Sequence, residues 1–245
     1  MDSNHSREHL RAVIAAGDSN ALVRFLTGKA WPADSLQLIG DGLIDATAAG
    51  VDGAATEARH CAAVLRERGW DGDDLLADAL QAGVGDRPQP ELLPVPVDLD
   101  QLAAALETSQ WNNPGRLNLS TGEVWPPLDP DYADTDDEDD DEEDDEGWLP
   151  IHGQGSRAGY RDMGVFIAHL DDPAIAGRLN AAIHGPRAFR RFKDTLSSQP
   201  DLLKDWYAFS QDRQVGRARA WLAEEGYVRA APDPTRHTRP APPEP

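Results

Sequence analysis

A run of acidic residues in the middle of the chain restricts the fold more than any other feature. Between residues 129 and 146, fourteen of eighteen residues are Asp or Glu, and the stretch 136–146 is unbroken. Like charges at this density repel one another and supply no apolar surface, so the run cannot join a packed core. We therefore predict a long, solvated, disordered loop, with the packed elements on either side of it.

The charge of the rest of the chain narrows the class of protein. The 245 residues carry 44 acidic and 23 basic side chains, a formal net charge of −21. Outside the run, 30 acidic residues stand against 23 basic ones. Such a surface repels phosphate except at a local basic patch, which excludes a nucleic-acid-binding protein that is cationic over its whole surface.

Cysteine usage and hydropathy set further limits. Cys61 is the single cysteine, which excludes an intramolecular disulfide and any multi-cysteine metal site. The first ten residues are polar, and no stretch approaches eighteen consecutive apolar residues. We therefore expect no signal peptide, no membrane span, a cytoplasmic location, and no metal or other cofactor.

The first third of the chain predicts a helical unit. Over residues 1–85, apolar residues recur at i, i+3, i+4 and i+7, and glycines such as Gly28, Gly50 and Gly69 stand where helices end. The next segment, 86–96, carries four prolines. Because proline fixes φ and cannot continue a helix, we predict an inter-domain linker there.

Residues 97–228 predict a second domain that contains a small sheet. After a first helix, polarity alternates over 116–119 and 123–125 around a Ser-Thr-Gly turn, which is a hairpin signal. The apolar run 148–151 is expected to pair with that hairpin. The acidic loop, 129–147, would then project from a small antiparallel sheet.

The chain from Ser156 onward predicts five helices, with the fourth around Trp206 and the fifth around Trp221. Six prolines and few apolar residues in 229–245 predict a disordered tail. The expected fold class is α+β and mostly α. It combines an N-terminal helical-hairpin unit with a small antiparallel β-sheet packed against a C-terminal helical bundle.

The third of these helices is the candidate binding site. Phe189 and Phe192 are predicted to face the core. Another face forms a positive patch on an acidic protein, from Arg187, Arg190, Arg191 and Lys193. Guanidinium groups bind phosphate or carboxylate in bidentate geometry, so the patch suits an anionic ligand. The alternative is a solvated face whose arginines pair with acids of the same chain, such as Asp162 or Asp205.

Aromatic residues follow in the last helices, chiefly Trp206, Tyr207, Phe209 and Trp221. Core packing is the favoured role for this group, because aromatic side chains dominate core burial. Tyr207 and the edge of one tryptophan are the candidates for exposure beside the arginine helix. An arginine surface with an aromatic residue suits nucleic-acid bases or a protein partner.

The acidic run has two further interpretations besides a solvated loop. It could imitate nucleic acid and occupy a basic site, on a partner or on the arginine patch of this chain. It could also bind divalent cations weakly, although it lacks the glycine and the spaced ligands of an EF-hand.

The C-terminal half also resembles a known family. Residues 185–194 read G-P-R-A-F-R-R-F-K-D, followed by W-Y-A-F at 206–209 and W-L at 221–222. This pattern resembles the uncharacterised bacterial protein family 0158 of the UPF series over roughly residues 97–227. The resemblance implies no activity, because that family has no assigned function. The chain departs from the pattern at Pro186 and Arg187, in the added unit 1–85 and in the long acidic run.

These features favour a non-enzymatic interaction or regulatory module. The arginine patch would bind a protein partner or nucleic acid, and the acidic run would compete for the patch or steer a basic partner. The alternative is an enzyme that holds a phosphorylated or nucleic-acid substrate in an arginine phosphate clamp. That enzyme would need His152, His184 or Asp162 beside the clamp in a concave pocket. The sequence identifies no base or nucleophile, and it predicts no oligomeric state.

Overall fold

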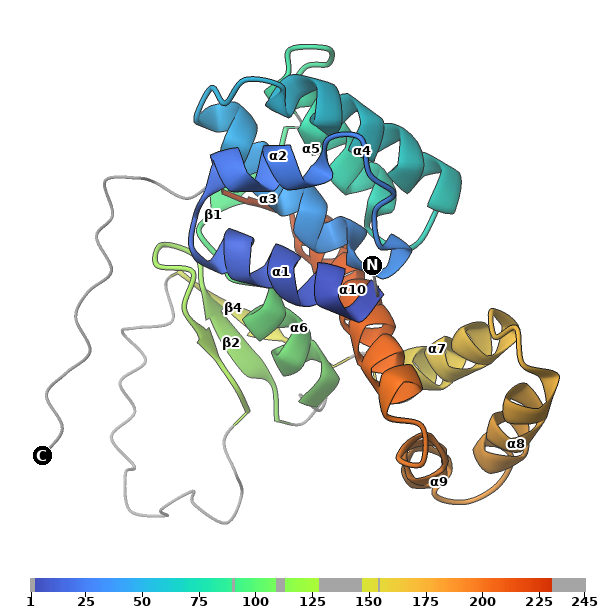
Figure 1. Ribbon diagram of the computed structural model, residues 1–245. Helices are drawn as coiled ribbons and strands as arrows, with labels where there is room; N and C mark the ends of the chain where they lie inside the picture. The colour runs from blue at the N-terminus through green and yellow to red at the C-terminus, as the bar shows by residue number, and fades with distance from the viewer. Residues whose placement is uncertain (1–2, 90, 109–112, 128–146, 154, 231–245) are drawn as a thin grey trace, which may run out of the picture.

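The structure of the protein is a computed structural model that describes residues 3–89, 91–108, 113–127, 147–153 and 155–230 (Figure 1). Within these ranges the helices are α1 (Ser3–Ala15), α2 (Ser19–Leu26), the short 3-10 helix η1 (Ala33–Ser35), α3 (Leu36–Ala48), α4 (Ala54–Arg68), α5 (Asp73–Gly83), α6 (Leu99–Thr108), α7 (Arg157–Ala168), α8 (Pro173–Ile183), α9 (Ala188–Leu196) and α10 (Pro200–Glu224). The strands are β1 (Leu93–Val95), β2 (Gly115–Asn118), β3 (Val124–Trp125), β4 (Trp148–Ile151) and β5 (Tyr227–Arg229). The mostly helical α+β prediction is confirmed. None of these helices is long and apolar enough to cross a membrane.

Helices α1 to α5 form a helical unit with a core of its own. Leu10, Ile39, Leu43, Leu65 and Leu76 are fully buried in this core. The apolar stripe of each helix faces the others, as the i, i+3, i+4 spacing predicts. The unit lies against one side of α10 (Figure 1).

Strands β2, β3 and β4 form an antiparallel sheet in the order β3-β2-β4. The sequence prediction of a hairpin joined by a third strand is therefore confirmed. Leu117 and Ile151 of this sheet are fully buried against α6 and the C-terminal half of α10. The acidic residues 129–146 lie outside the described residues, so their loop stays a prediction.

A parallel pair of strands, which the sequence did not indicate, ties the two ends of the second domain together. β1 lies within the segment 86–96 that we predicted as a linker, and it pairs with β5 in the register Leu93 with Tyr227. Arg229, the first residue of the predicted tail, is the last residue of β5. Residues 231–245 of that tail lie outside the described residues.

Helix α10 corrects the prediction of two separate C-terminal helices. The polar stretch between Phe209 and Val215 looks like a break between two apolar patterns, yet the helix runs through it without interruption. Asp212 and Arg213 in this stretch are both buried. An ion pair with another element compensates the charge of each. Polar residues therefore occupy buried positions of one long central helix.

Helices α7, α8 and α9 project from the rest of the molecule, where α7 and α9 pack on α10 and α8 packs on α7 and α9 (Figure 1). Their residues share a third core with α10, which includes Met163, Phe166, Leu179, Phe192 and Trp206. We call residues 157–204 the arm. The candidate patch on α9 belongs to this arm.

Candidate interaction surface

Helix α9 presents the predicted cations to solvent. Arg187, Arg190, Arg191 and Lys193 are all exposed. The helix is held to the arm from its opposite side, where Phe192 and Leu196 are each 1% exposed. Apolar and charged residues at helical spacing therefore give α9 one buried face and one charged face.

Phe189 corrects part of this prediction, because its side chain is 40% exposed instead of facing the core. Phe189 lies in the first turn of α9, where its ring rests against the backbone of Gly159 in α7. This position covers one side of the ring and leaves the other accessible. An apolar ring therefore stands among the cations of the charged face.

The four predicted cations differ in their contacts. Arg191 donates hydrogen bonds to the carbonyl oxygens of His184, at 3.1 Å, and Ala181, at 3.2 Å. These bonds satisfy carbonyls at the end of α8, so Arg191 has a structural role. Arg190 lies 3.8 Å from Asp194 in an exposed pair that stabilises little.

Arg187 has an unusual backbone. Its φ of 60° is the single positive φ of a non-glycine residue in the described parts of the chain. An L-residue in this left-handed conformation is strained, and such strain collects at functional sites.

Tyr207 is 50% exposed, while its neighbours Trp206 and Phe209 are buried. The Lys193 amine lies 6.0 Å from the centre of the Tyr207 ring. Tyr207 therefore borders the charged face of α9, as predicted. Trp221, buried in the core around the sheet, is not part of this surface.

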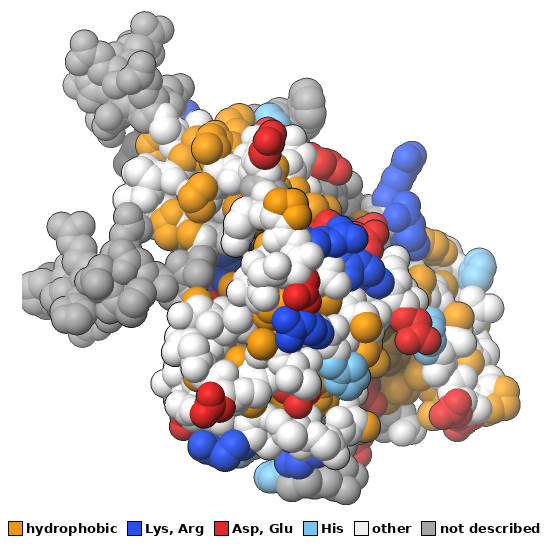
Figure 2. Space-filling model, turned by 90° about the horizontal axis from the view of Figure 1, so that it is seen from above, with side chains coloured by type: hydrophobic (Ala, Val, Ile, Leu, Met, Phe, Trp, Pro, Cys, Tyr) orange, Lys and Arg blue, Asp and Glu red, His pale blue; other side chains and the backbone are white. Residues whose placement is uncertain are grey.

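The charge of the whole arm exceeds that of α9 alone. All eight Lys and Arg residues of the arm are exposed, against four exposed carboxylates and the buried Asp162. The additional cations are Arg157, Arg161, Arg178 and Lys204. On the face seen from above in Figure 2, in contrast, basic and acidic side chains are interspersed. The sequence did not indicate this wider basic surface, because its cations lie on several helices.

Asp162 anchors the arm and is not available to a ligand. Its carboxylate is 1% exposed and accepts hydrogen bonds from Arg213, at 2.5 Å, and Arg217, at 2.8 Å. Arg217 also reaches Glu107 of α6, at 3.0 Å. Desolvation opposes the charge of Arg217, yet these carboxylates outweigh it and raise the pKa of that guanidinium. The acid considered for the arginine patch therefore pairs with α10.

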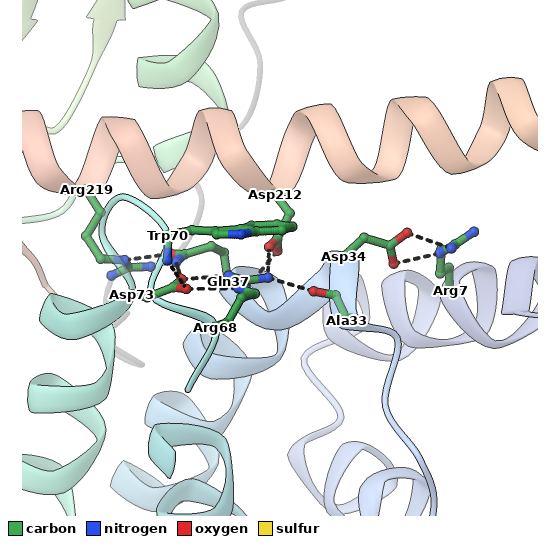
Figure 3. Close-up of polar contacts among 9 residues, drawn as sticks. All are labelled: Arg7, Ala33, Asp34, Gln37, Arg68, Trp70, Asp73, Asp212 and Arg219. Atoms are coloured by element: carbon green, nitrogen blue, oxygen red, sulfur yellow. Dashed lines mark hydrogen bonds and ion pairs between the residues drawn. The ribbon is translucent and has the colours of Figure 1, made fainter. Parts of the chain in front are cut away.

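A second buried network joins the helical unit to α10 (Figure 3). Arg68 of α4 binds both Asp73, at 2.6 Å, and Asp212 of α10, at 2.5 Å. The backbone amide of Gln37 donates to Asp212 at 2.8 Å, and its side-chain oxygen accepts from Arg219 at 3.0 Å. Burial raises the pKa of Asp212 to about 6, because desolvation outweighs the attraction of Arg68 and the Gln37 amide.

Close backbone packing accompanies this network. A Cβ atom on Gly216 of α10 would lie 2.2 Å from the carbonyl oxygen of Asp71, so only glycine fits there. Trp70 in the same turn stacks on the guanidinium groups of Arg68 and Arg213, at 4.0 and 4.9 Å from its ring centre. No local sequence signal marked these residues, because their partners are far away in the chain.

The enzyme interpretation requires a pocket beside α9, but the large groove that the described residues form lies elsewhere in the molecule. This groove, of about 860 Å³, lies between the helical unit, α6 and α10, away from the arm. Its carboxylates Asp34, Asp41 and Asp100 are hydrogen-bonded to Arg7, Arg219 and Gln211. Asp45 there has one buried oxygen without a hydrogen-bond partner, and burial raises the pKa of this acid.

Two other groups that could act in catalysis, His184 and Cys61, have structural surroundings. His184 contacts the carbonyl oxygen of Asn180 in its own helix, at 2.6 Å. Cys61 is fully buried, and desolvation raises the pKa of its thiol to about 12, so it is no thiolate nucleophile. Among the described residues, no three His, Cys, Asp or Glu side chains come together in a way that could hold a metal ion.

The geometry is that of a mostly helical α+β protein with an exposed basic arm on a central helix. The chain belongs to the Uncharacterised protein family (UPF0158), whose profile matches residues 97–234. A UPF0158 protein of Pseudomonas aeruginosa is 27% identical over 138 residues, which are 56% of this chain and 88% of that relative. No solved structure matches the chain. The predicted family is confirmed, and the unit 1–85 lies outside the matched segment.

Proposed function

We propose that the protein is a non-enzymatic interaction module that binds an acidic protein partner through the arm. The observation that carries this proposal is the charge of the arm, eight exposed cations against four exposed carboxylates on a chain of net charge −21. A local positive surface on an acidic protein attracts anionic partners and orients them during encounter. Tyr207 and Phe189 add apolar contact area at its edge.

Within the arm, Arg187, Arg190 and Lys193 are the residues that we assign to the partner. Arg191 and Tyr207 complete the surface, although Arg191 also holds the end of α8. The acidic run 129–146 would compete for the same surface or attract a basic partner of its own. Nucleic acid is the second candidate ligand for these cations, because phosphate and carboxylate accept the same bidentate contacts.

The test is a binding titration with a labelled poly-glutamate peptide, an RNA and a DNA oligonucleotide. The triple variant Arg187→Ala, Arg190→Ala and Lys193→Ala should bind the peptide about tenfold or more weakly, with a smaller salt dependence. A matched variant removes two arginines and one lysine from the helical unit, at Arg24, Lys29 and Arg59. It should bind the peptide as the wild type does.

Equal losses in the two triple variants would contradict a role for the arm, since net charge alone would then explain binding. Tighter binding of RNA or DNA than of the peptide would make nucleic acid the ligand. A third variant changes every Asp and Glu of 129–146 to Asn or Gln. If the run competes for the arm, this variant should bind the anionic peptide more tightly.

A further inference from the structure

The outer face of the three-stranded sheet carries two tryptophans beside its polar side chains. Arg116 of β2 is in register with Trp125 of β3 and Pro150 of β4, and Asn118 is in register with Trp148. Residues directly opposite one another in antiparallel strands point to the same side of a sheet. The neighbouring row, with Leu117 at its centre, faces the core, so these five residues share the outer face.

The two tryptophans make contact with each other over the central strand. Their ring centres lie 4.7 Å apart, with an angle of 49° between the ring planes. Trp125 is 50% exposed, and Trp148 is half-buried. Arg116 on the same face is engaged in interactions of its own. The pair therefore forms an aromatic surface that contributes little to the core beneath it.

The chemistry of the tryptophan pair favours a cation. The face of an indole ring attracts ammonium and guanidinium groups, and arginine also stacks on it. In the sequence, the acidic run begins four residues after Trp125 and ends two residues before Trp148. Fourteen carboxylates thus stand between the two strands in the sequence, and a segment of this charge attracts cations and repels phosphate.

We infer that the outer face of this sheet is a docking site for an arginine-rich segment of a protein partner. Guanidinium groups of that segment stack on the Trp125–Trp148 pair, while the acidic run supplies long-range attraction. This inference rests on the acidic-run part of the proposed function and assigns that part a partner and a fixed contact surface. The sheet and the arm lie on opposite sides of α10 in Figure 1, so the two sites can be tested separately.

The test uses the full chain and a fluorescein-labelled Arg-Gly repeat peptide, with a citrulline-Gly peptide as the uncharged control. Trp125→Ala and Trp148→Ala keep every charge of the chain, and each should weaken binding about fivefold to tenfold. Leu93→Ala removes another exposed apolar side chain, on β1, and should bind within about twofold of the wild type. Trp125→Phe keeps an aromatic face and should recover part of the loss, which separates stacking from misfolding.

The outcomes distinguish this inference from the proposed function. If both tryptophan variants bind the arginine peptide as the wild type does, the docking site is wrong, even where neutralising 129–146 abolishes binding. If the neutralised run leaves peptide binding unchanged, the acidic-run part of the proposed function is wrong as well. Tighter binding of a single-stranded RNA, with a loss in Trp125→Ala, would overturn the class of partner.

Discussion

Replacement of Asp162 by Asn should destabilise the protein strongly, because this carboxylate compensates two buried guanidinium groups. Asp162 is 1% exposed, and the side chains of Arg213 and Arg217 are 9% and 8% exposed. An amide keeps the shape of the carboxylate but loses its charge. Arg217 would retain the carboxylate of Glu107, whereas Arg213 would have no carboxylate partner among the described residues and would keep its aromatic contacts with Trp70 and Phe209.

The magnitude follows from how such pairs behave. Removal of one partner from a buried ion pair costs about 3–5 kcal/mol, because it leaves an uncompensated charge in a low dielectric. Asp194→Asn is the matched control, since its pair with Arg190 joins side chains that are 71% and 77% exposed, with 3.8 Å between the charged atoms. An exposed i, i+4 pair of this kind contributes about 0.5 kcal/mol or less.

The assay is equilibrium unfolding in urea, followed by circular dichroism and by tryptophan fluorescence. Asp162→Asn should lower the free energy of unfolding by several times the loss in Asp194→Asn. It should also weaken binding of the anionic peptide, although no cation of the arm is removed, because Asp162 fixes α7 on α10. A loss below about 1 kcal/mol in Asp162→Asn, or equal losses in both variants, would refute the compensation argument.

Three further predictions concern backbone strain, pH and close packing. Arg187→Gly should raise the free energy of unfolding by about 1 kcal/mol, because glycine adopts a φ of 60° without strain. The same variant should weaken binding of the anionic peptide. A melting temperature below that of the wild type would contradict the strain argument. The pKa of Asp212 is about 6 in the folded protein, above its unfolded value, so between these two values the native state binds a proton that the unfolded state does not. The contribution of Asp212 to the free energy of unfolding should therefore fall by about 3 kcal/mol as the pH rises from 4 to above 6. Urea titrations across that range should show the decrease in the wild type relative to Asp212→Asn, and parallel curves would contradict it. Gly216→Ala should lower the free energy of unfolding by about 2 kcal/mol or more, since its Cβ would lie 2.2 Å from the carbonyl oxygen of Asp71. Gly177→Ala is the control, because it has open space around it and should stabilise α8 by about 1 kcal/mol in thermal unfolding.

The sequence predicted those elements whose polarity reflects one buried and one exposed face. The alternation around Leu117 and the apolar run ending at Ile151 correctly indicated the antiparallel sheet. The same reasoning placed Phe192 in the core and the α9 cations in solvent. It failed for Phe189, because a residue in the first turn of a helix can lie at the edge of the surface that covers its neighbours.

The missed features depend on contacts between distant residues. The polar residues between Phe209 and Val215 suggested a helix end, because Asp212 and Arg213 read as exposed when their partners Arg68 and Asp162 are unknown. The pairing of β1 with β5 has the same origin, since neither short segment shows a strand pattern by itself. Apolar periodicity in a sequence indicates residues that are buried by apolar contacts. It does not indicate charged residues whose burial is compensated by ion pairs.

The net charge of −21 therefore describes neither of the surfaces that we assign to partners. The arm is basic because eight cations stand against five carboxylates in it, and the burial of Asp162 against arginines of α10 increases this excess at the surface. The sheet face is uncharged at Trp125 and Trp148, and its negative potential is expected from a segment joined to both strands in the sequence. The two proposed surfaces lie on different halves of α10, so a chain with both would bind an acidic and a basic partner at once. In separate titrations the protein should bind each peptide, and if the run and the arm are bound to each other, neutralising the run should tighten binding of the anionic peptide to the arm.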